Sequence, residues 1–299
     1  MLPNRNPRFE TYVLPARAKP QLWRLVAGLV VGTMIYLASV MYMLNFAARL
    51  GIDMMSVFRG HGTPLATSVM LLTFTGMGVA VIFSARVFQK RAPATLFGPD
   101  LSAVRRNFTI TATLILPIMV IWTGIGFLSD MPLPNLPLAT WLLWLPSSLV
   151  LVLLQTTSEE LVFRGYLQQQ LAARFSSRWI WWLGPALLFG LAHYDSAANG
   201  ENAWLVVLDT FLIGLIAGDL TARTGNLGAA IGLHFTNNAV VLLFVSLAGD
   251  LSGLSLNVTP FSIADTASVR AMLITDITVM LMLYLGYLFI LKKWAARAQ

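Results

Sequence analysis

Long apolar segments separated by short polar stretches make up most of this chain. A membrane-spanning helix needs about 20 predominantly apolar residues, and several of the segments reach or approach that length. They cover residues 25–47, 64–86, 107–129, 140–158, 180–195, 203–221, 227–248 and 271–291, of which the fifth is the shortest. We therefore expect an all-α, polytopic membrane protein, a bundle of about eight transmembrane helices.

The composition favours lipid rather than water as the surroundings of this bundle. Of the 299 residues, 57% are hydrophobic and only 11% are charged, whereas a soluble domain has about 25% charged residues. So few charges cannot cover the surface of a soluble fold of this size. Lipid instead requires an apolar exterior and backbone hydrogen bonds that are satisfied within the protein.

The polar stretches suggest a simple domain organisation. Residues 1–24 are expected to form a cytoplasmic N-terminal tail, residues 25–291 a single transmembrane domain, and residues 292–299 a cytoplasmic C-terminal tail. Between the spans, residues 92–106 predict a short interfacial segment, and residues 249–269 predict a polar outer loop.

The distribution of lysine and arginine predicts the orientation of the spans. With eight spans, only Arg49, Arg59 and Arg270 of the 20 basic residues fall on the side opposite the termini, which leaves 17 on the side of the termini. Positively charged loops tend to remain in the cytoplasm. We therefore expect a multi-pass protein of the cell membrane with both ends cytoplasmic. The net charge of +7 then reflects orientation in a bilayer, and nucleic acid is not expected as a partner.

Ionisable and amide side chains lie inside several of these apolar segments. An ionisable residue costs about 2.5–3.5 kcal/mol to insert at the centre of a span, so each one is a functional-site hypothesis by default. A single buried histidine is more often a hydrogen-bonded core residue, but a whole set of such residues favours a site. The set comprises Glu159, Glu160 and Arg164 at the inner end of the fourth span, His193 in the fifth, and His234 and Asn238 in the seventh.

Helical geometry separates the two neighbouring glutamates. At 100° per residue, Glu160 and Arg164 lie about 40° apart and can form an ion pair on one helix face. Glu159 lies about 140° from Arg164 and points elsewhere. We therefore expect Arg164 to neutralise Glu160 and to leave Glu159 without a partner close by in the sequence.

Two further features restrict the chemistry and the packing. The chain has no cysteine, which excludes disulfides, thiolate metal ligands and a cysteine nucleophile. Two pairs of glycines spaced four residues apart, Gly214 with Gly218 and Gly228 with Gly232, favour close approach of helices. The second pair directly precedes His234, and close packing there would hold this histidine in a defined position.

The polar residues form three short motifs on three different spans. They are EExxxR from Glu159 to Arg164, FxxxH from Phe189 to His193, and HxxxN from His234 to Asn238. With these motifs in this order, the sequence resembles the CAAX protease and bacteriocin-processing (CPBP) family of intramembrane proteases, the family of the type II CAAX prenyl endopeptidases. The resemblance covers about residues 140–245, and the remaining spans match only in being hydrophobic.

The resemblance implies a role for each motif. Glu159 and His193 would activate a water molecule, His234 and Asn238 would stabilise the oxyanion, and Glu160 with Arg164 would shape the site. The implied activity is that of an intramembrane endopeptidase acting on a peptide or membrane-protein substrate within the lipid bilayer. A CAAX-type peptide or another membrane-associated peptide would serve as substrate.

The sequence leaves the cofactor and two other classes of function open. Glu159, His193 and His234 could supply a zinc site with a free position for water, but they would have to converge from separate helices. The same residues serve a metal-free mechanism, which we favour. A proton-coupled secondary transporter would also use buried carboxylates and histidines, although no inverted repeat is evident. A non-catalytic membrane scaffold of the same fold is the third interpretation.

Overall fold

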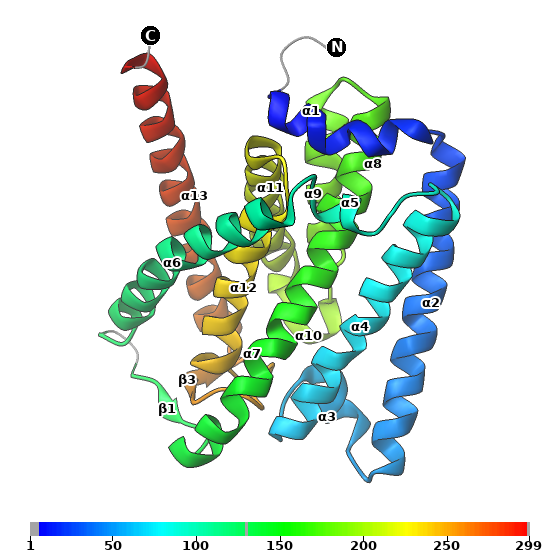
Figure 1. The fold of residues 1–299 in the computed structure, drawn as a ribbon. Helices are drawn as coiled ribbons and strands as arrows, with labels where there is room; N and C mark the ends of the chain where they lie inside the picture. Colours follow the sequence, from blue (N-terminus) through cyan, green and yellow to red (C-terminus); the bar gives the residue numbers. More distant parts are fainter. Residues whose placement is uncertain (1–5, 129–130, 298–299) are drawn as a thin grey trace.

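The computed structural model describes residues 6–128 and 131–297, and helices occur in all eight predicted segments. Within these residues, six helical runs are long and apolar enough to cross a membrane, and two shorter apolar helices accompany them. The prediction of an all-α polytopic bundle is therefore confirmed (Figure 1). The six long runs are α2 (Leu22–Arg49), α4 (Pro64–Val87), α6 (Leu101–Gly126), Leu138–Arg174, Ser196–Thr224 and α13 (Thr266–Arg297); the shorter helices are Trp179–Leu191 and α12 (Gly228–Leu243).

Several of these runs consist of more than one type of helix. Two contain a π-helical stretch, a form that is rare and frequent at functional sites. The run Leu138–Arg174 comprises α7 (Leu138–Glu160), the π-helix η2 (Leu161–Gln168) and α8 (Gln169–Arg174). The others are Trp179–Leu191, made of the π-helix η3 (Trp179–Leu183) and α9 (Gly184–Leu191), and Ser196–Thr224, made of α10 (Ser196–Asn199), η4 (Gly200–Asn202) and α11 (Ala203–Thr224).

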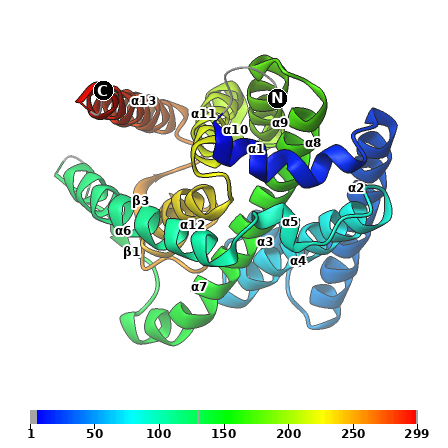
Figure 2. The same cartoon turned by 45° about the horizontal axis from the view of Figure 1, so that its top comes forward.

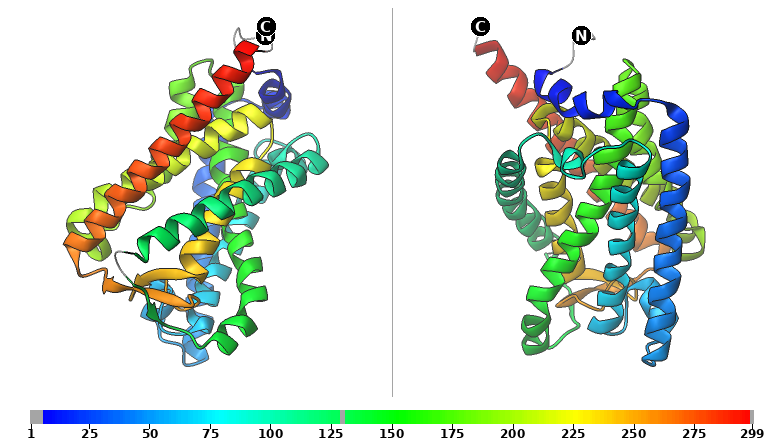
Figure 3. Two further views of the ribbon diagram at one scale, coloured as in Figure 1. Left: turned by 90° about the vertical axis from the view of Figure 1, so that its left-hand side faces the viewer. Right: turned by 45° about the vertical axis from the view of Figure 1, so that its right-hand side comes forward.

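The two ends of the bundle carry different small elements. Both termini lie at one end, together with α1 (Pro7–Val13), η1 (Leu14–Ala18), α5 (Ala94–Phe97) and α8 (Figures 1 and 3). The other end carries α3 (Met54–Arg59) and a small sheet (Figure 3). An even number of membrane crossings, which the charge distribution predicts, would place both termini at one end in this way.

A three-stranded sheet departs from the all-helical expectation. Its strands are β1 (Leu133–Pro134), β2 (Val245–Ala248) and β3 (Asn257–Ser262), with β3 in the centre, antiparallel to β1 and parallel to β2. The predicted seventh span was therefore too long at its C-terminal end, because α12 stops at Leu243 and β2 follows. A short apolar run fits a strand as well as a helix, and hydropathy alone does not distinguish them.

The predicted N-terminal tail is helical and packs against the bundle. Arg5, one of the basic residues counted there, lies outside the described residues, but Phe9, Tyr12 and Val13 of α1 are buried. The Tyr12 hydroxyl lies 2.8 Å from the carbonyl oxygen of Leu96 and 3.1 Å from that of Arg164. Burial raises the pKa of this hydroxyl above its usual value, so it remains a donor. The segment therefore covers the end of the motif-bearing helix.

The C-terminal tail is also helical. Helix α13 extends to Arg297, six residues beyond the predicted end of the last span at residue 291. Hydropathy ends a span where charged residues begin, but a helix continues through lysine and arginine because both are good helix formers.

Helix α12 occupies a central position in the bundle. It contacts α6, α7 and α11 (Figure 2). A Cβ atom added to Gly228 would lie only 2.0 Å from the carbonyl oxygen of Val104, and one added to Gly232 would lie 2.7 Å from that of Phe108. The close approach predicted from these two glycines is confirmed, and it fixes the upper half of α12, which leads to His234.

Candidate active site

The three motifs come together between α7, η2, α9 and α12. Glu159 and Glu160 are the last two residues of α7, and Arg164 follows in η2. His234 and Asn238 face them from α12, while His193 lies just beyond the C-terminus of α9. Helix α12 packs against α7, and α9 packs against η2. Segments that are far apart in the sequence therefore place their polar side chains in one region of the bundle.

Glu160 and Arg164 form the ion pair that the helix geometry predicts. Their side chains are 2.9 Å apart, and both are fully buried, with 0% and 1% exposure. Arg164 also donates to the carbonyl oxygen of Gly214, at 3.1 Å, and its guanidinium lies 4.7 Å from the ring centroid of Phe189. A charge buried this deeply is stable only when it is paired and hydrogen-bonded. This arrangement joins η2 to α9 and α11.

Glu159 points away from Arg164, also as predicted. Its Oε2 atom accepts a hydrogen bond from Gln155, at 2.9 Å, and lies 3.3 Å from Nε2 of His234. Within residues 6–128 and 131–297, no ion pair joins Glu159 to an arginine or lysine. Glu159 is thus a buried carboxylate whose partners are an amide and an imidazole.

His234 lies between the two glutamates. Its Nδ1 atom is 2.9 Å from Oε1 of Glu160, and its Nε2 atom is 3.3 Å from Oε2 of Glu159. A neutral imidazole donates from one nitrogen, and a protonated one donates from both. Because the shorter contact is to the ion-paired Glu160, the geometry favours a hydrogen on Nδ1. That bond sets the orientation of the ring and aims Nε2 at Glu159.

Asn238 joins the same cluster through a residue that the sequence analysis missed. Its amide nitrogen donates to Oε1 of Gln155, at 3.0 Å, and its amide oxygen accepts from Asn237, at 3.1 Å. Gln155 is a neutral side chain, so a search for ionisable residues within spans passes over it. The available signal was its spacing, since it precedes Glu159 by four residues on one helix.

His193 belongs to the site but touches none of these polar groups directly. Its Nδ1 atom lies 2.8 Å from the carbonyl oxygen of Phe189, which can only accept, so Nδ1 carries a hydrogen, and in a neutral ring Nε2 has a lone pair. The ring of Phe189 packs edge-on against both His193 and His234, at centroid distances of 4.8 and 5.7 Å. The FxxxH motif therefore places one aromatic ring beside both histidines.

The geometry does not form the zinc site considered from the sequence. In the described part of the chain, no group of three or more histidine, aspartate and glutamate side chains is positioned to hold a metal ion. His193 is held toward a backbone carbonyl, and both nitrogens of His234 face carboxylates. Glu159, His193 and His234 therefore do not converge on one point as three ligands of a single ion would.

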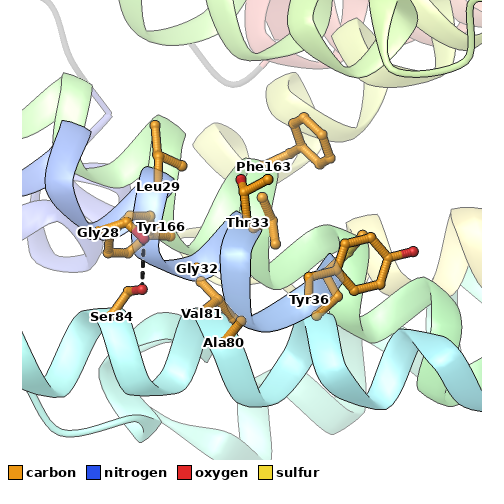
Figure 4. A pocket seen from close by; sticks show the side chains of 12 residues that line it. Gly28, Leu29, Gly32, Thr33, Tyr36, Ala80, Val81, Ser84, Phe163 and Tyr166 are labelled. Atoms are coloured by element: carbon orange, nitrogen blue, oxygen red, sulfur yellow. Dashed lines mark hydrogen bonds between the residues drawn. The ribbon is translucent and has the colours of Figure 1, made fainter. Parts of the chain in front are cut away.

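A cavity of about 190 Å³ lies beside the motif helix, between α2, α4 and η2 (Figure 4). Its lining is mainly apolar, and a hydrogen bond of 2.7 Å from Ser84 to the carbonyl oxygen of Gly28 holds α4 and α2 together at its edge. Phe163 of η2 lines this cavity and packs edge-on against Phe189, with ring centroids 5.0 Å apart. One aromatic contact thus connects the cavity to the ring beside both histidines.

Comparison with known proteins agrees with this arrangement. The family model described as type II CAAX prenyl endopeptidase Rce1-like matches residues 140–240, which include all three motifs. Over a longer stretch, the chain is 25% identical across 256 residues to the uncharacterized protein YyaK of Bacillus subtilis (strain 168), an alignment covering 81% of this chain and 84% of that protein. The resemblance predicted from the motifs is confirmed. Residues 140–240 of this helical membrane protein, which carry all three motifs, are therefore similar to the Rce1-like type II CAAX prenyl endopeptidases.

Proposed function

We propose that this protein is an intramembrane endopeptidase that hydrolyses a peptide bond with a water molecule activated by Glu159 and His193. The observation that carries this proposal is the environment of the Glu159 side chain. It is a buried carboxylate, 3.3 Å from an imidazole nitrogen, and the neighbouring arginine is paired with Glu160 instead. A buried carboxylate beside an imidazole, with the neighbouring arginine paired elsewhere, is available as a general base.

The chemistry requires a base, a proton carrier and an oxyanion site. Glu159 takes a proton from water while the water oxygen attacks the carbonyl carbon of the scissile peptide bond. His193, with its lone pair on Nε2, orients this water from the other side. The N–H of Asn238 that Gln155 leaves free stabilises the negative oxygen of the tetrahedral intermediate, and His234 does so from Nε2 when this nitrogen carries a proton. When the C–N bond breaks, the proton held by Glu159 passes to the leaving amine.

Glu160 and Arg164 serve the reaction indirectly. Glu160 holds Nδ1 of His234, and Arg164 neutralises Glu160 and is anchored to Gly214. The pair keeps the His234 ring oriented toward Glu159. The site then contains one paired and one unpaired carboxylate, and only the unpaired one acts as the base.

Membrane-associated peptides are the substrate class that suits this site. The family model that matches is that of prenyl endopeptidases, and the site lies among apolar helices beside an apolar cavity. We propose CAAX-type or other membrane-associated peptides as substrates.

The test compares peptide cleavage by the wild type and by Glu159→Gln in proteoliposomes, with a panel of prenylated and unmodified CAAX-type peptides analysed by mass spectrometry. The matched control is Glu201→Gln, because Glu201 is a largely exposed glutamate that pairs with Arg270 outside the site. We expect cleavage by the wild type and the control, and a loss of at least about 100-fold in Glu159→Gln. Cleavage by Glu159→Gln at the wild-type rate would show that another group is the base.

A further inference from the structure

A buried glutamine in α7 connects the two ends of the catalytic cluster. Gln155 is 6% exposed and lies where the apolar stretch of the helix ends and the polar residues before Glu159 begin. An amide buried without partners is costly, yet both functional ends of this side chain are satisfied. Its nitrogen donates to Glu159, at 2.9 Å, and its oxygen accepts from Asn238, at 3.0 Å. One side chain thus contacts both the proposed base and the proposed oxyanion donor.

The carboxylate determines the direction of every hydrogen bond in this chain of amides. An ionised Glu159 can only accept, so the atom of Gln155 that faces it is the nitrogen. The oxygen of Gln155 then faces Asn238, which must donate through its own nitrogen. The oxygen of Asn238 in turn accepts from Asn237, at 3.1 Å. The orientation of three amides therefore follows from one charge, without independent assignment of each amide.

This order has a consequence for Asn238. The side-chain nitrogen of an asparagine carries two hydrogens, and Gln155 takes one of them. The second hydrogen remains available to a substrate. If the Asn238 amide turned over, its oxygen would face the oxyanion and repel it. Asn238 is half-buried, so packing alone does not prevent this rotation.

We infer that Gln155 is a positioning residue that couples the general base to the oxyanion site. This inference rests on the proposed peptidase function. Gln155 acts through Glu159 and Asn238, to which it is hydrogen-bonded. It keeps Asn238 turned with its free N–H toward the oxyanion, and it holds Oε2 of Glu159 so that Oε1 is left for water. Aligned amides also polarise one another, so the series of hydrogen bonds stabilises this arrangement more than the same bonds would separately.

Gln168 provides a matched control on the same helical run. It is a buried glutamine, 1% exposed, and its nitrogen donates to the carbonyl oxygen of Gly218, at 3.0 Å, away from the motif residues. Methionine is the chosen replacement at both positions because it has nearly the same length and no donor. Gln155→Asn is the second variant at the site, since it keeps an amide that is too short to reach both partners.

The turnover test measures kcat and KM with a farnesylated CAAX-type peptide that the wild type cleaves. We expect Gln155→Met and Gln155→Asn to lower kcat by about 10–100-fold with little change in KM, because an oxyanion donor acts in the transition state. Gln168→Met should keep the wild-type kcat. Adding Gln155→Met to Asn238→Ala should cost little more than Asn238→Ala alone, because the two residues act as one unit. If the separate losses in kcat of Gln155→Met and Asn238→Ala multiply in the double variant, the inference is overturned. An unchanged kcat in both Gln155 variants would also overturn it.

A second measurement tests the coupling between Gln155 and Asn238 without requiring peptide cleavage. The apparent melting temperatures of Gln155→Met, Asn238→Ala and the double variant form one double-mutant cycle. A second cycle uses Gln168→Met in place of Gln155→Met, again with Asn238→Ala. We expect shifts that are not additive in the first cycle and additive shifts in the second. Additive shifts in the first cycle would overturn the coupling even if no peptide is cleaved. A coupled chain in a protein that cleaves none of the peptides would instead count against the proposed function.

Discussion

At the residue scale, two adjacent glutamates acquire different roles because they point in different directions from one helix. Glu160 is fully buried against Arg164, and Glu159 faces Gln155 and His234. One residue of displacement turns a side chain by about 100°. That rotation decides which carboxylate is neutralised and which is left to accept a proton.

The first prediction separates these roles by stability. Glu160→Gln removes the counter-charge of a buried arginine, and breaking a buried ion pair on one side costs about 3–5 kcal/mol. We expect it to lower the apparent melting temperature in detergent by roughly 5–10 °C. Glu159→Gln should melt close to the wild type, because it has no ion pair to lose. Glu201→Gln again serves as the control, since its partner Arg270 is partly exposed. Equal melting temperatures for the two motif variants would contradict the assignment.

The residue scale also shows how far sequence reasoning reaches. The pairing of Glu160 with Arg164 follows from a spacing of four on a helix, and the structure confirms it. The contacts of Glu159 with His234 and of Gln155 with Asn238 join residues more than 70 positions apart. Helical periodicity contains no information about such contacts, because they depend on how α12 is turned against α7.

At the element scale, close packing of α12 against α6 positions His234. The glycines that permit this packing were identifiable from their spacing. The partner helix was not, because a small-residue pattern shows that a face is flat without showing what covers it. The same limit applies to α1. Its residues read as a polar tail, yet Phe9, Tyr12 and Val13 complete the core around η2.

The second prediction concerns this helix contact. In Gly228→Ala, the new Cβ atom would lie 2.0 Å from the backbone carbonyl oxygen of Val104, which cannot rotate away as a side chain would. We expect α12 and α6 to separate, with a loss of about 1–3 kcal/mol in stability and reduced cleavage, because His234 moves with α12.

The matched control for Gly228→Ala is Gly124→Ala in α6, where nothing lies within 4 Å of the new atom. It should leave the melting temperature and the cleavage rate unchanged. If Gly228→Ala behaves like Gly124→Ala, the contact between α12 and α6 does not hold the site in place.

At the scale of the whole molecule, the arrangement of the ends matters for access to the site. Glu159 and Glu160 are the last two residues of α7, and η2 and α8 continue this run to the end of the bundle that carries both termini. If that end is cytoplasmic, as the basic residues predict, a substrate reaches the site from the inner half of the bilayer. An inverted protein would receive its substrates from the other side.

The last prediction tests this orientation with single cysteines, which is straightforward because the chain contains none. Ser176 lies in the segment between α8 and η3, at the end of the bundle that carries the termini, and Ala197 lies in α10 on the predicted outer side; both are exposed. In intact cells, a membrane-impermeant maleimide should label Ala197→Cys and leave Ser176→Cys unlabelled. After permeabilisation it should label both, which shows that each cysteine is reactive. Labelling of Ser176→Cys alone in intact cells would show that the topology is the reverse of the predicted one. Because positively charged loops resist translocation, that result would mean that the 17 basic residues on the side of the termini do not determine how the chain inserts.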